Sequence, residues 1–372
     1  MKYYIIAGEA SGDLHGSNLM KALYKEDPTA DIRFWGGDLM QNVGGTLVRH
    51  YRDLAFMGFI EVIFNLKTIL SNIKICKADI EEFQPDVIIF IDYPGFNMRI
   101  AKWAKEKGIA THYYISPQIW AWKENRIAAI KRDVDKMYVI LPFEKDFYEV
   151  KHNFPVEFVG HPLIDAIHNR TKVDDDVFKK DNNLSDLPII ALLPGSRKQE
   201  ISKMLTIMLS VVDDFPDYQF VIAGAPSQEY SFYEQFLKNK NIHFITNRTY
   251  DLLSVSTAAL VTSGTATLET ALFKVPEVVC YKGSWASYQI AKRIITLKYI
   301  SLVNLIMDEE VVTELIQNDC NKKRIKAELQ KILSPEYRSQ LLAKYELLEQ
   351  KLGGEGASEK TAKLILKNIK SN

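Results

Sequence analysis

Short apolar runs, most of them followed by a turn and a helical pattern, recur along the chain. Nine of these runs are continuous rather than alternating: KYYIIA, DVIIFI, ATHYYI, KMYVIL, PIIALL, YQFVIAG, IHFIT, AALVT and PEVVCY. Strands that are buried on both faces by crossover helices show this continuous pattern. The alternation with helical windows predicts an α/β protein with two doubly wound parallel sheets.

The apolar runs fall into two groups, separated by the polar stretch TKVDDDVFKKDNNLSDLP at 171–188. This stretch has no sustained apolar period, so we interpret it as the linker into a second domain. Its triple Asp174–Asp176 is interpreted as part of a solvated loop rather than as a metal site. We therefore expect an N-terminal Rossmann-like domain at 1–168 and a C-terminal Rossmann-like domain at 169–345.

The C-terminal part of the chain has a charged, helical pattern. It is interrupted by GGEG at 353–356, after which Ser358 is a plausible N-cap for a last helix. We expect the segment 346–372 either to return to the N-terminal domain or to be exchanged with a second chain in a homodimer.

A long amphipathic pattern, LAFMGFIEVIFNLKTILSNIK at 54–74, has an apolar face wider than a packed helix requires. A narrow polar strip opposite this face consists of Glu61, Asn65, Thr68 and Asn72. Such a helix fits contact with a membrane surface, and burial between domains or in a dimer interface is the alternative. The residues predicted to contact the membrane are Phe59, Ile60, Ile63, Phe64 and Lys67.

Charge and cysteine usage narrow the class of protein. The 372 residues carry 47 basic and 47 acidic side chains, and this formal net charge of zero argues against a general nucleic-acid-binding protein. The 3 cysteines are far apart, which suits neither a disulfide framework nor a zinc site and predicts a reducing, cytoplasmic setting. No apolar run reaches about 20 residues, so we expect no membrane-spanning helix.

Two loops in the C-terminal group directly follow strands and favour an anionic ligand. SGTATLE at 263–269 offers hydroxyl and N–H groups at the start of a helix, where a diphosphate would bind, unless the segment is only an N-capping cluster. Arg197, after the turn of LLPGSR, could reach the same diphosphate. The predicted donor-binding residues in these loops are Gly195, Ser196, Ser263, Gly264, Thr265, Thr267 and Glu269, the last for ribose hydroxyls.

Loops of the N-terminal group also carry candidate chemistry. GEASGD at 8–13 forms a strand, Gly-rich turn and helix start, an arrangement typical of phosphate binding. IDYPGFN at 91–97 places Asp92 at the carboxyl end of a strand, where it is a candidate general base or a simple turn residue. Asn97 would steady this loop or touch the ligand. His161, in FVGHPL, is more typical of a structural histidine than of a catalytic one.

Two tryptophans lie next to several cations in HYYISPQIWAWKENRIAAIKR at 112–132. The combination of Trp120 and Trp122 with Lys123 and Arg126 suggests a surface for an amphipathic anion, such as an acylated sugar phosphate. The alternative is a helix whose tryptophans pack on the sheet while its basic side faces solvent.

A set of short segments is specific in combination, although each is weak alone. The segments are GEASGD (8–13), MGFIEV (57–62), IDYPGFN (91–97), SPQIWAW (116–122), LPFE (141–144), FVGHPL (158–163), LLPGSR (192–197), SGTATLE (263–269) and SLVNLI (301–306). In this order and spacing the chain resembles the lipid A disaccharide synthases, bacterial glycosyltransferases of the GT-B fold. The resemblance implies two Rossmann-like domains that face each other across a cleft.

The resemblance also implies a reaction: 2,3-diacylglucosamine is transferred from UDP to 2,3-diacylglucosamine 1-phosphate (lipid X), giving UDP and a β(1→6)-linked disaccharide 1-phosphate. An α-linked donor that yields a β-glycoside requires inversion in a single displacement. The family pattern gives the base role to Asp92 and the stabilisation of the leaving diphosphate to Arg197. Asn304 would hold donor or phosphate groups. Neither a metal ion nor another cofactor is expected.

On the acceptor side, the resemblance implies a role for Gly8, Glu9, Ser11, Gly12, Asp13, Asn97, Ser116, Trp122 and Arg126, with Glu9 or Asp13 bracing the first turn. Because both substrates carry acyl chains, we expect peripheral association with the cytoplasmic face of the inner membrane. The sequence departs from the family pattern at Gly95, Gln118, Val303 and Thr313, none of which is assigned to the chemistry.

Two other functions fit parts of the sequence. A UDP-sugar epimerase of the same fold would share the nucleotide-binding domain but would not need the apolar face at 54–74. A non-catalytic lipid-binding module would explain that face and leave Asp92, Arg197 and Glu269 unexplained. A nicotinamide-dependent dehydrogenase fits poorly, because GEASGD lacks the G-x-G-x-x-G pattern.

Overall fold

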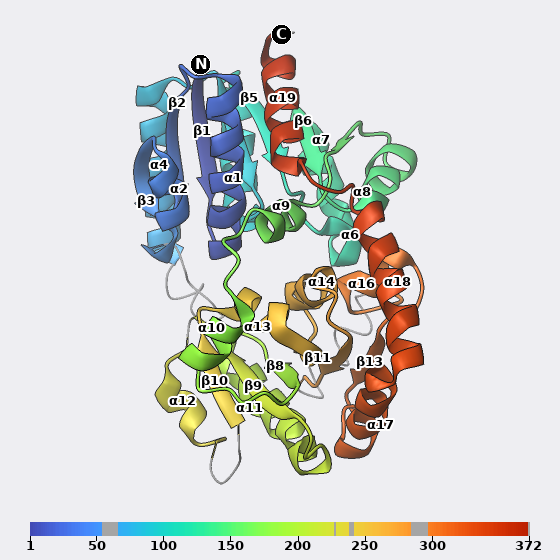
Figure 1. The fold of residues 1–372 in the computed structure, drawn as a ribbon. Coiled ribbons are helices and arrows are strands. Elements are labelled where there is room, and N and C mark those ends of the chain that lie inside the picture. Colours follow the sequence, from blue (N-terminus) through green and yellow to red (C-terminus); the bar gives the residue numbers. More distant parts are fainter. Residues whose placement is uncertain (54–65, 227, 238–241, 284–296, 371–372) are drawn as a thin grey trace. The chain divides into compact units, whose positions relative to one another are not determined.

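The computed structural model describes residues 1–53, 66–226, 228–237, 242–283 and 297–370. The chain divides into two compact units, one formed by Met1–His168 together with Leu352–Asn372 and the other by Asn169–Lys351. Residues 346–351 fall in the second unit because helix α18 continues to Lys351. Each unit is built on its own parallel sheet (Figure 1).

The first unit contains a parallel sheet with the strand order β3-β2-β1-β4-β5-β6-β7. Its strands are β1 (Lys2–Ala7), β2 (Asp31–Gly36), β3 (Thr46–His50), β4 (Val87–Ile91), β5 (Ala110–Tyr114), β6 (Lys136–Val139) and β7 (Glu157–Phe158). Its helices are α1 (Ala10–Glu26), α2 (Asp38–Val43), α4 (Leu66–Phe83), α5 (Pro94–Glu106), α6 (Ile119–Trp122), α7 (Ile127–Asp133), α8 (Pro142–Asp146), α9 (Pro162–His168) and α19 (Ala357–Lys370). Short turns are η1 (Tyr51–Asp53), η2 (Glu124–Arg126) and the π-helical η3 (Phe147–Lys151).

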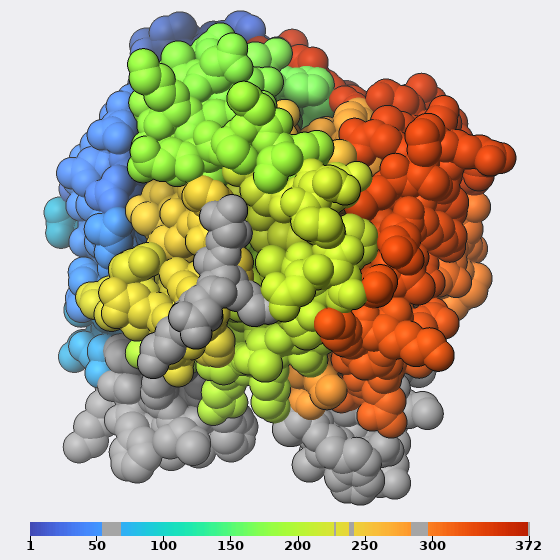
Figure 2. All heavy atoms as spheres, turned by 60° about the horizontal axis from the view of Figure 1, so that its bottom comes forward, coloured from blue at the N-terminus to red at the C-terminus, as the bar shows by residue number. Residues whose placement is uncertain are grey.

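The second unit contains a parallel sheet with the strand order β10-β9-β8-β11-β12-β13. Its strands are β8 (Ile189–Leu193), β9 (Gln219–Gly224), β10 (Ile242–Thr246), β11 (Ser256–Thr262), β12 (Glu277–Tyr281) and β13 (Thr313–Ile316). Its helices are α10 (Asp175–Asp181), α11 (Lys198–Met208), η4 (Leu209–Asp214), α12 (Tyr230–Glu234), α13 (Thr249–Val255), α14 (Thr265–Leu272), α16 (Leu302–Met307), α17 (Lys322–Leu333) and α18 (Pro335–Lys351). Helices α17 and α18 pack together, and α17 also contacts α11 and η4. Figure 2 shows the orange atoms of the C-terminal helices beside yellow-green atoms of the same unit.

The continuous apolar runs form the centres of both sheets, which confirms the prediction of two doubly wound parallel sheets. Strands β1, β4, β8 and β11 are buried almost throughout, because helices cover both faces of each sheet. The strands that the apolar pattern did not predict are β2, β3, β7 and β13, which are short, lie at or near the sheet edges or carry charged residues.

The strand order reverses in the middle of each sheet. In the first unit β1 lies next to β4, and in the second unit β8 lies next to β11. Crossover connections leave such a point in opposite directions, and ligand sites of doubly wound sheets commonly form at the carboxyl ends of the two neighbouring strands. GEASGD and IDYPGFN are these loops in the first unit, and LLPGSR and SGTATLE are the corresponding loops in the second.

The last helix belongs to the first unit, where α19 lies beside α1 (Figure 1). The sequence suggested Ser358 as the N-cap of this helix, but the helix already begins at Ala357. The carboxylate of Asp165, on α9, accepts hydrogen bonds from Gly356 N (2.7 Å) and Ser358 N (3.0 Å) instead. A side chain distant in sequence thus satisfies the helix start.

The stretch interpreted as a solvated linker contains the short helix α10. Asp174 caps it, accepting hydrogen bonds from the N–H groups of Asp176 and Val177 at 3.1 Å, and Phe178 is buried. The interpretation of the Asp triple as part of a loop is therefore wrong. The three residues form a helix cap and first turn, where carboxylates are favourable.

The described part of the 54–74 segment differs from its helical projection. In α4, Asn72 is only 3% exposed although we placed it on the polar strip, while Leu70 is 57% exposed. Ile73, by contrast, packs against the core of the first unit. The membrane-contact residues Phe59, Ile60, Ile63 and Phe64, and the side chain of Lys67, lie outside the described residues.

Candidate active site: loops at the reversal points of the two sheets

The turn after β4 holds Asp92 in an unusual backbone conformation. Asp92 and the following Tyr93 both have positive φ angles, 43° and 47°, a left-handed region that residues other than glycine rarely occupy. Two buried side chains hold the Asp92 carbonyl oxygen, since Tyr113 Oη donates to it at 2.5 Å and Asn97 Nδ2 at 2.7 Å. Asn97 therefore steadies the loop, one of the two roles proposed for it.

Gly8 makes room for this turn. The Tyr93 ring lies so close to the Gly8 backbone that a β-carbon there would approach ring atom Cδ1 to 2.2 Å. Gly12 is packed against Ala7 in the same way, with a β-carbon position 3.1 Å from the Ala7 β-carbon. Gly8 thus allows close packing between the two loops at the reversal point, and Gly12 allows α1 to pack closely on the end of β1; neither glycine has a positive φ angle.

The carboxyl group of Asp92 is poised near neutral pH. Burial raises its pKa to about 6, and the negative charge of Glu9 acts in the same direction. A hydrogen bond from the Tyr93 backbone opposes the shift. A half-buried carboxylate at the end of a rigid strand, with a pKa near the pH of the cell, has the properties required of a general base.

The other polar residues of GEASGD have different roles. Asp13 is buried, and its carboxylate accepts hydrogen bonds from Gly37 N (2.8 Å), Leu39 N (3.0 Å) and Met40 N (3.0 Å). Asp13 therefore braces the loop before α2 rather than the turn to which it belongs. Both of its carboxylate oxygens are engaged by backbone N–H groups, not by the acceptor substrate. Glu9 and Ser11 are exposed.

The segment after β5 is fastened by a buried carboxylate. Glu144 accepts hydrogen bonds from Ser116 Oγ (2.5 Å), Trp120 Nε1 (3.2 Å) and the N–H groups of Ile140 and Leu141. Burial raises the pKa of Glu144, against the effect of these donors. Ser116 is thus occupied inside the protein and does not face an acceptor, contrary to the expectation.

Trp122 and Arg126 remain accessible from the same segment. Trp122 is 53% exposed, with Lys123 Nζ 3.7 Å from the centre of its ring. Burial and the negative charge of Asp92 raise the pKa of the Tyr113 hydroxyl, and the positive charge of Arg126 opposes that shift.

His161 is a structural histidine. Its ring is buried, and Nδ1 accepts a hydrogen bond from Leu163 N at 3.2 Å. Burial, together with the nearby His15, lowers the pKa of His161 to about 3, so the ring is neutral near neutral pH. This matches the more typical of its two interpretations.

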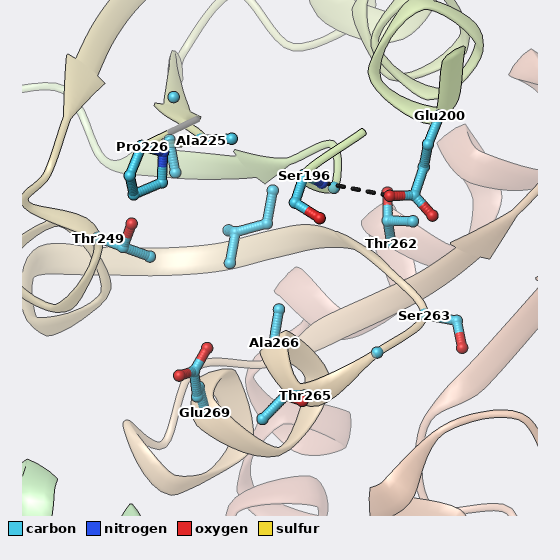
Figure 3. A pocket seen from close by; sticks show the side chains of 15 residues that line it. Ser196, Glu200, Ala225, Pro226, Thr249, Thr262, Ser263, Thr265, Ala266 and Glu269 are labelled. Carbon is cyan, nitrogen blue, oxygen red and sulfur yellow. Dashed lines mark hydrogen bonds between the residues drawn. The ribbon is translucent and has the colours of Figure 1, made fainter. Parts of the chain in front are cut away.

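The second unit contains a pocket of about 330 Å³ at the reversal point of its sheet. It is lined by the loops after β8, β9 and β11 and by the start of α14 (Figure 3). Six of the predicted donor-binding residues line it: Gly195, Ser196, Ser263, Gly264, Thr265 and Glu269. Arg197, Thr267 and Asn304 are not part of the lining.

The turn after β8 is shaped by a glutamate that the sequence did not single out. Glu200 Oε2 accepts a hydrogen bond from Ser196 N at 3.2 Å (Figure 3). Gly195 has a φ of 101°, and a β-carbon there would lie 2.2 Å from the same oxygen. Arg197 follows as the exposed N-cap of α11 and, within the described residues, its side chain makes no hydrogen bond or ion pair.

The start of α14 contains both a residue that caps the helix and residues that are exposed. Thr267 is buried and its hydroxyl donates to Gly264 O at 2.9 Å, so it stabilises the helix start. This differs from the prediction that Thr267 faces the donor. Gly264 has a φ of 156° and no atom near its β-carbon position, and Thr265 is exposed. The first N–H groups of α14 therefore border the pocket, as an anion site at a helix N-terminus requires.

Glu269 lies one turn into α14 and lines the pocket (Figure 3). Tyr250 Oη donates to its Oε1 at 2.7 Å, which fixes the carboxyl group and leaves its other oxygen for a ligand. Burial raises the pKa of Glu269, and the hydrogen bond from Tyr250 opposes that effect. The arrangement suits recognition of neighbouring hydroxyl groups.

Asn304 is fully buried and its amide group is fully engaged. Its Nδ2 donates to Val312 O (2.8 Å) and Glu314 Oε1 (2.9 Å), while its Oδ1 accepts from Val311 N (2.8 Å) and Val312 N (2.9 Å). The expectation that Asn304 holds the donor directly is therefore not supported, because no amide atom is left for a ligand.

Comparison with known proteins identifies the family. A family model described as "Lipid-A-disaccharide synthetase" matches residues 3–368. The chain belongs to the lipid-A-disaccharide synthase family. A synthase from Syntrophus aciditrophicus is 39% identical over 99% of this chain and 98% of its own length, and one from Coxiella burnetii is 37% identical over 97% and 96%. As a member of this family the chain is a glycosyltransferase that forms the lipid A disaccharide in lipid A biosynthesis, which confirms the predicted function class.

Solved structures confirm the predicted GT-B fold of this chain. UDP-GlcNAc 2-epimerase from Neisseria meningitidis, bound to UDP-GlcNAc, is 14% identical with a TM-score of 0.66 and covers 100% of both chains. The glycotransferase of kitacinnamycin is 13% identical with a TM-score of 0.68 and covers 98% of each chain. At this identity the likeness shows the fold alone.

Two features are absent from the part of the chain that the structure describes. No helix among them is both long and apolar enough to cross a membrane. Within the same residues, no group of three or more His, Cys, Asp or Glu side chains is arranged to hold a metal ion.

Several residues that shape the synthase's loops escaped the sequence analysis. Tyr113, Glu200, Tyr250 and Glu314 each contact a predicted site residue or the loop that carries it. Only Glu200 could have been found from the sequence, because it lies four residues after its partner Ser196. An acidic residue in the first turn of a helix commonly accepts a hydrogen bond from the backbone just before that helix. The others come from distant segments.

Proposed function

We propose that this chain transfers 2,3-diacylglucosamine from UDP to the 6-hydroxyl of 2,3-diacylglucosamine 1-phosphate. The second unit binds the UDP part of the donor, and the first unit supplies the base and binds the acceptor. The observation that carries this proposal is the Asp92 turn, where burial raises the pKa of the carboxyl group to about 6 on a backbone fixed by Tyr113 and Asn97.

The chemistry follows from the groups in the two loop pairs. Asp92 accepts the proton of the acceptor 6-hydroxyl while that oxygen attacks the anomeric carbon on the face opposite UDP. The bond from that carbon to the diphosphate breaks, and the α-linked donor becomes a β-linked disaccharide. The proton stays on Asp92 until solvent removes it.

The leaving diphosphate needs positive charge and N–H donors. Arg197, whose guanidinium has no partner within the described residues, and the open start of α14 provide both. Glu269, fixed by Tyr250, accepts hydrogen bonds from the ribose hydroxyls. Because these groups supply the electrostatic stabilisation, we expect EDTA to leave turnover unchanged.

The acylated substrates favour peripheral association with the cytoplasmic face of the inner membrane. Leu70 and Ile75 are 57% and 40% exposed on α4 and are supported by the exposed Lys74. Apolar side chains next to a lysine suit the boundary of a bilayer. Ile60→Ser with Phe64→Ser is expected to weaken binding to vesicles. The alternative in which the last helix is exchanged in a homodimer is tested by the molar mass from light scattering.

The decisive experiment measures UDP release from UDP-2,3-diacylglucosamine with and without the monosaccharide 1-phosphate. We expect release to depend on the acceptor and the disaccharide 1-phosphate to accumulate in equal amount. A UDP-sugar epimerase would instead convert the donor to its epimer without the acceptor. Release that does not depend on the acceptor would contradict the proposal.

A further inference from the structure

The pocket of the second unit is supported by a carboxylate that does not line it. Glu314, on the edge strand β13, accepts hydrogen bonds at 2.9 Å from Ile300 N through Oε2 and from Ser301 N and Asn304 Nδ2 through Oε1. Hydrogen bonds to an ionised carboxylate are stronger than those between neutral groups. This one side chain therefore fixes the backbone just before α16.

The same backbone segment reaches the pocket. Ser263 Oγ donates to the carbonyl oxygen of Ile300 at 2.9 Å, and Ser263 itself lines the pocket. The peptide group between Ile300 and Ser301 thus links two side chains, because its N–H, that of Ser301, donates to Glu314 and its carbonyl, that of Ile300, accepts from Ser263. Ser263 directly precedes Gly264, which opens the helix whose first N–H groups border the pocket.

The position of Asn304 gains an explanation from this connection. Its amide has no atom free for a ligand, but it holds Glu314 on one side and the backbone of Val311 and Val312 on the other. Asn304 and Glu314 therefore form one buried support for the loop that carries Ile300. Either residue would affect the donor without touching it.

We propose that Glu314 is a positioning residue for the nucleotide donor and acts through Ile300 on Ser263. The inference rests on the proposed binding of UDP in the second unit. In the free protein the carboxylate holds the Ile300 carbonyl in place, so that the Ser263 hydroxyl is oriented before the diphosphate arrives. Binding then does not have to order this part of the loop.

A double-mutant cycle isolates this route from a general loss of stability. The dissociation constant of UDP is measured by calorimetry for the full chain as wild type, Ser263→Ala, Glu314→Gln and the double variant. We expect each single change to weaken UDP binding about fivefold, the effect of about one lost hydrogen bond. If Glu314 acts through Ser263, the double variant is also about fivefold weaker rather than about 25-fold weaker.

A control variant lies on the same strand. Thr313→Val removes the hydrogen bond from Thr313 Oγ1 to Glu328 (3.1 Å), which has no connection to the pocket, and we expect UDP affinity to stay unchanged. Glu314→Gln is also expected to raise the KM for the donor without changing the KM for the acceptor. If Glu314→Gln does not fold, Glu314→Asp, which keeps the charge but is too short to reach all three donors, takes its place in the cycle.

The outcomes separate this inference from the function on which it rests. Independent effects that multiply in the double variant, or a Glu314→Gln protein with wild-type affinity, would overturn the role of Glu314 and leave the donor site intact. A wild-type protein that does not bind UDP would overturn the donor site itself.

Discussion

The two reversal points of the synthase use opposite means to present chemical groups. In the first unit the turn after β4 consists of Asp92 and Tyr93, which have positive φ angles although neither is glycine. The buried side chains of Tyr113 and Asn97 donate hydrogen bonds to the backbone carbonyl oxygen of Asp92. In the second unit the positive φ angles fall on Gly195 and Gly264, and the residues that follow them, Ser196 and Thr265, are exposed.

This difference indicates a division of labour. A backbone held in a sparsely populated conformation persists only where the surroundings determine it, and such places are common where a reacting group must be positioned. Glycine turns at helix starts let a ligand approach the backbone N–H groups closely. We therefore expect changes in the Asp92 turn to reduce the rate of transfer, and changes around the pocket to reduce mainly donor affinity and stabilisation of the leaving group.

The largest effect is expected from Asp92→Asn. Asparagine tolerates positive φ as well as aspartate does, so the turn is kept while the base is lost. Turnover should fall about 10³-fold with an unchanged dissociation constant for UDP, measured by UDP release and by calorimetry. Removing a half-buried ionised carboxylate should also raise the free energy of unfolding at pH 8 by about 3 kcal/mol, because folding no longer has to bury a charge whose pKa it raises.

Asp135→Asn is the matched control, since that carboxylate pairs with Lys105 and the Thr111 backbone far from the Asp92 turn in sequence. Its turnover should stay within about twofold of wild type. A loss of only several-fold in Asp92→Asn would remove Asp92 from the base role.

Arg197→Ala is expected to have the next largest effect. The substitution removes the positive charge that stabilises the leaving diphosphate. Turnover should therefore fall about 10²-fold, and UDP affinity should fall less. Arg197→Lys keeps the positive charge but loses the bidentate geometry of the guanidinium donors. Its turnover should lie between that of wild type and that of Arg197→Ala. Equal losses in turnover and affinity would show that Arg197 serves binding alone.

Tyr113→Phe tests the support of the turn. Asn97 still bonds to the Asp92 carbonyl in this variant, so the fold should persist while the carboxylate loses precise placement. We expect turnover to fall about tenfold with UDP affinity unchanged. Tyr138→Phe, in the same sheet but with its hydroxyl bonded to His112 and Asn368, should lower thermal stability and not turnover. Similar turnover in both variants would contradict a positioning role for Tyr113.

The smallest effect is expected at the membrane. Leu70→Ser removes an exposed apolar side chain from α4 and should weaken co-sedimentation with anionic vesicles about threefold. Leu347→Ser, on α18 and 47% exposed, is the control and should leave co-sedimentation unchanged. Equal binding by both variants would show that α4 has no special part in membrane contact.

The sequence predicted the strands with continuous apolar runs and the loops that follow them, because burial on both faces leaves a direct signature. It did not predict β2, where Arg33 interrupts the apolar pattern yet pairs with Asp79 at 2.7 Å and covers the Phe83 ring. Edge strand β13 was missed for a similar reason, since its Glu314 is a hydrogen-bonding residue of the fold.

Site residues were harder to predict than strands, because a residue type does not reveal which hydrogen bonds it already makes. Asp13, Thr267 and Asn304 have the polar groups of ligand-binding residues, but each is occupied by backbone partners. Ser116 is occupied by Glu144. Asp92 and Glu269 keep an available carboxylate oxygen, which is visible only when the partners from distant segments are in place.

The pH dependence of the single-turnover rate tests the central claim most directly, because it connects the Asp92 carboxyl group to the chemistry. Since burial raises the pKa of Asp92 to about 6 and the base must be ionised, the wild-type rate should be level above that pH. Below it, the rate should fall about tenfold per pH unit. The residual rate of Asp92→Asn should show no such inflection. A wild-type rate that stays level well below pH 6, or the same inflection in Asp92→Asn, would contradict the account.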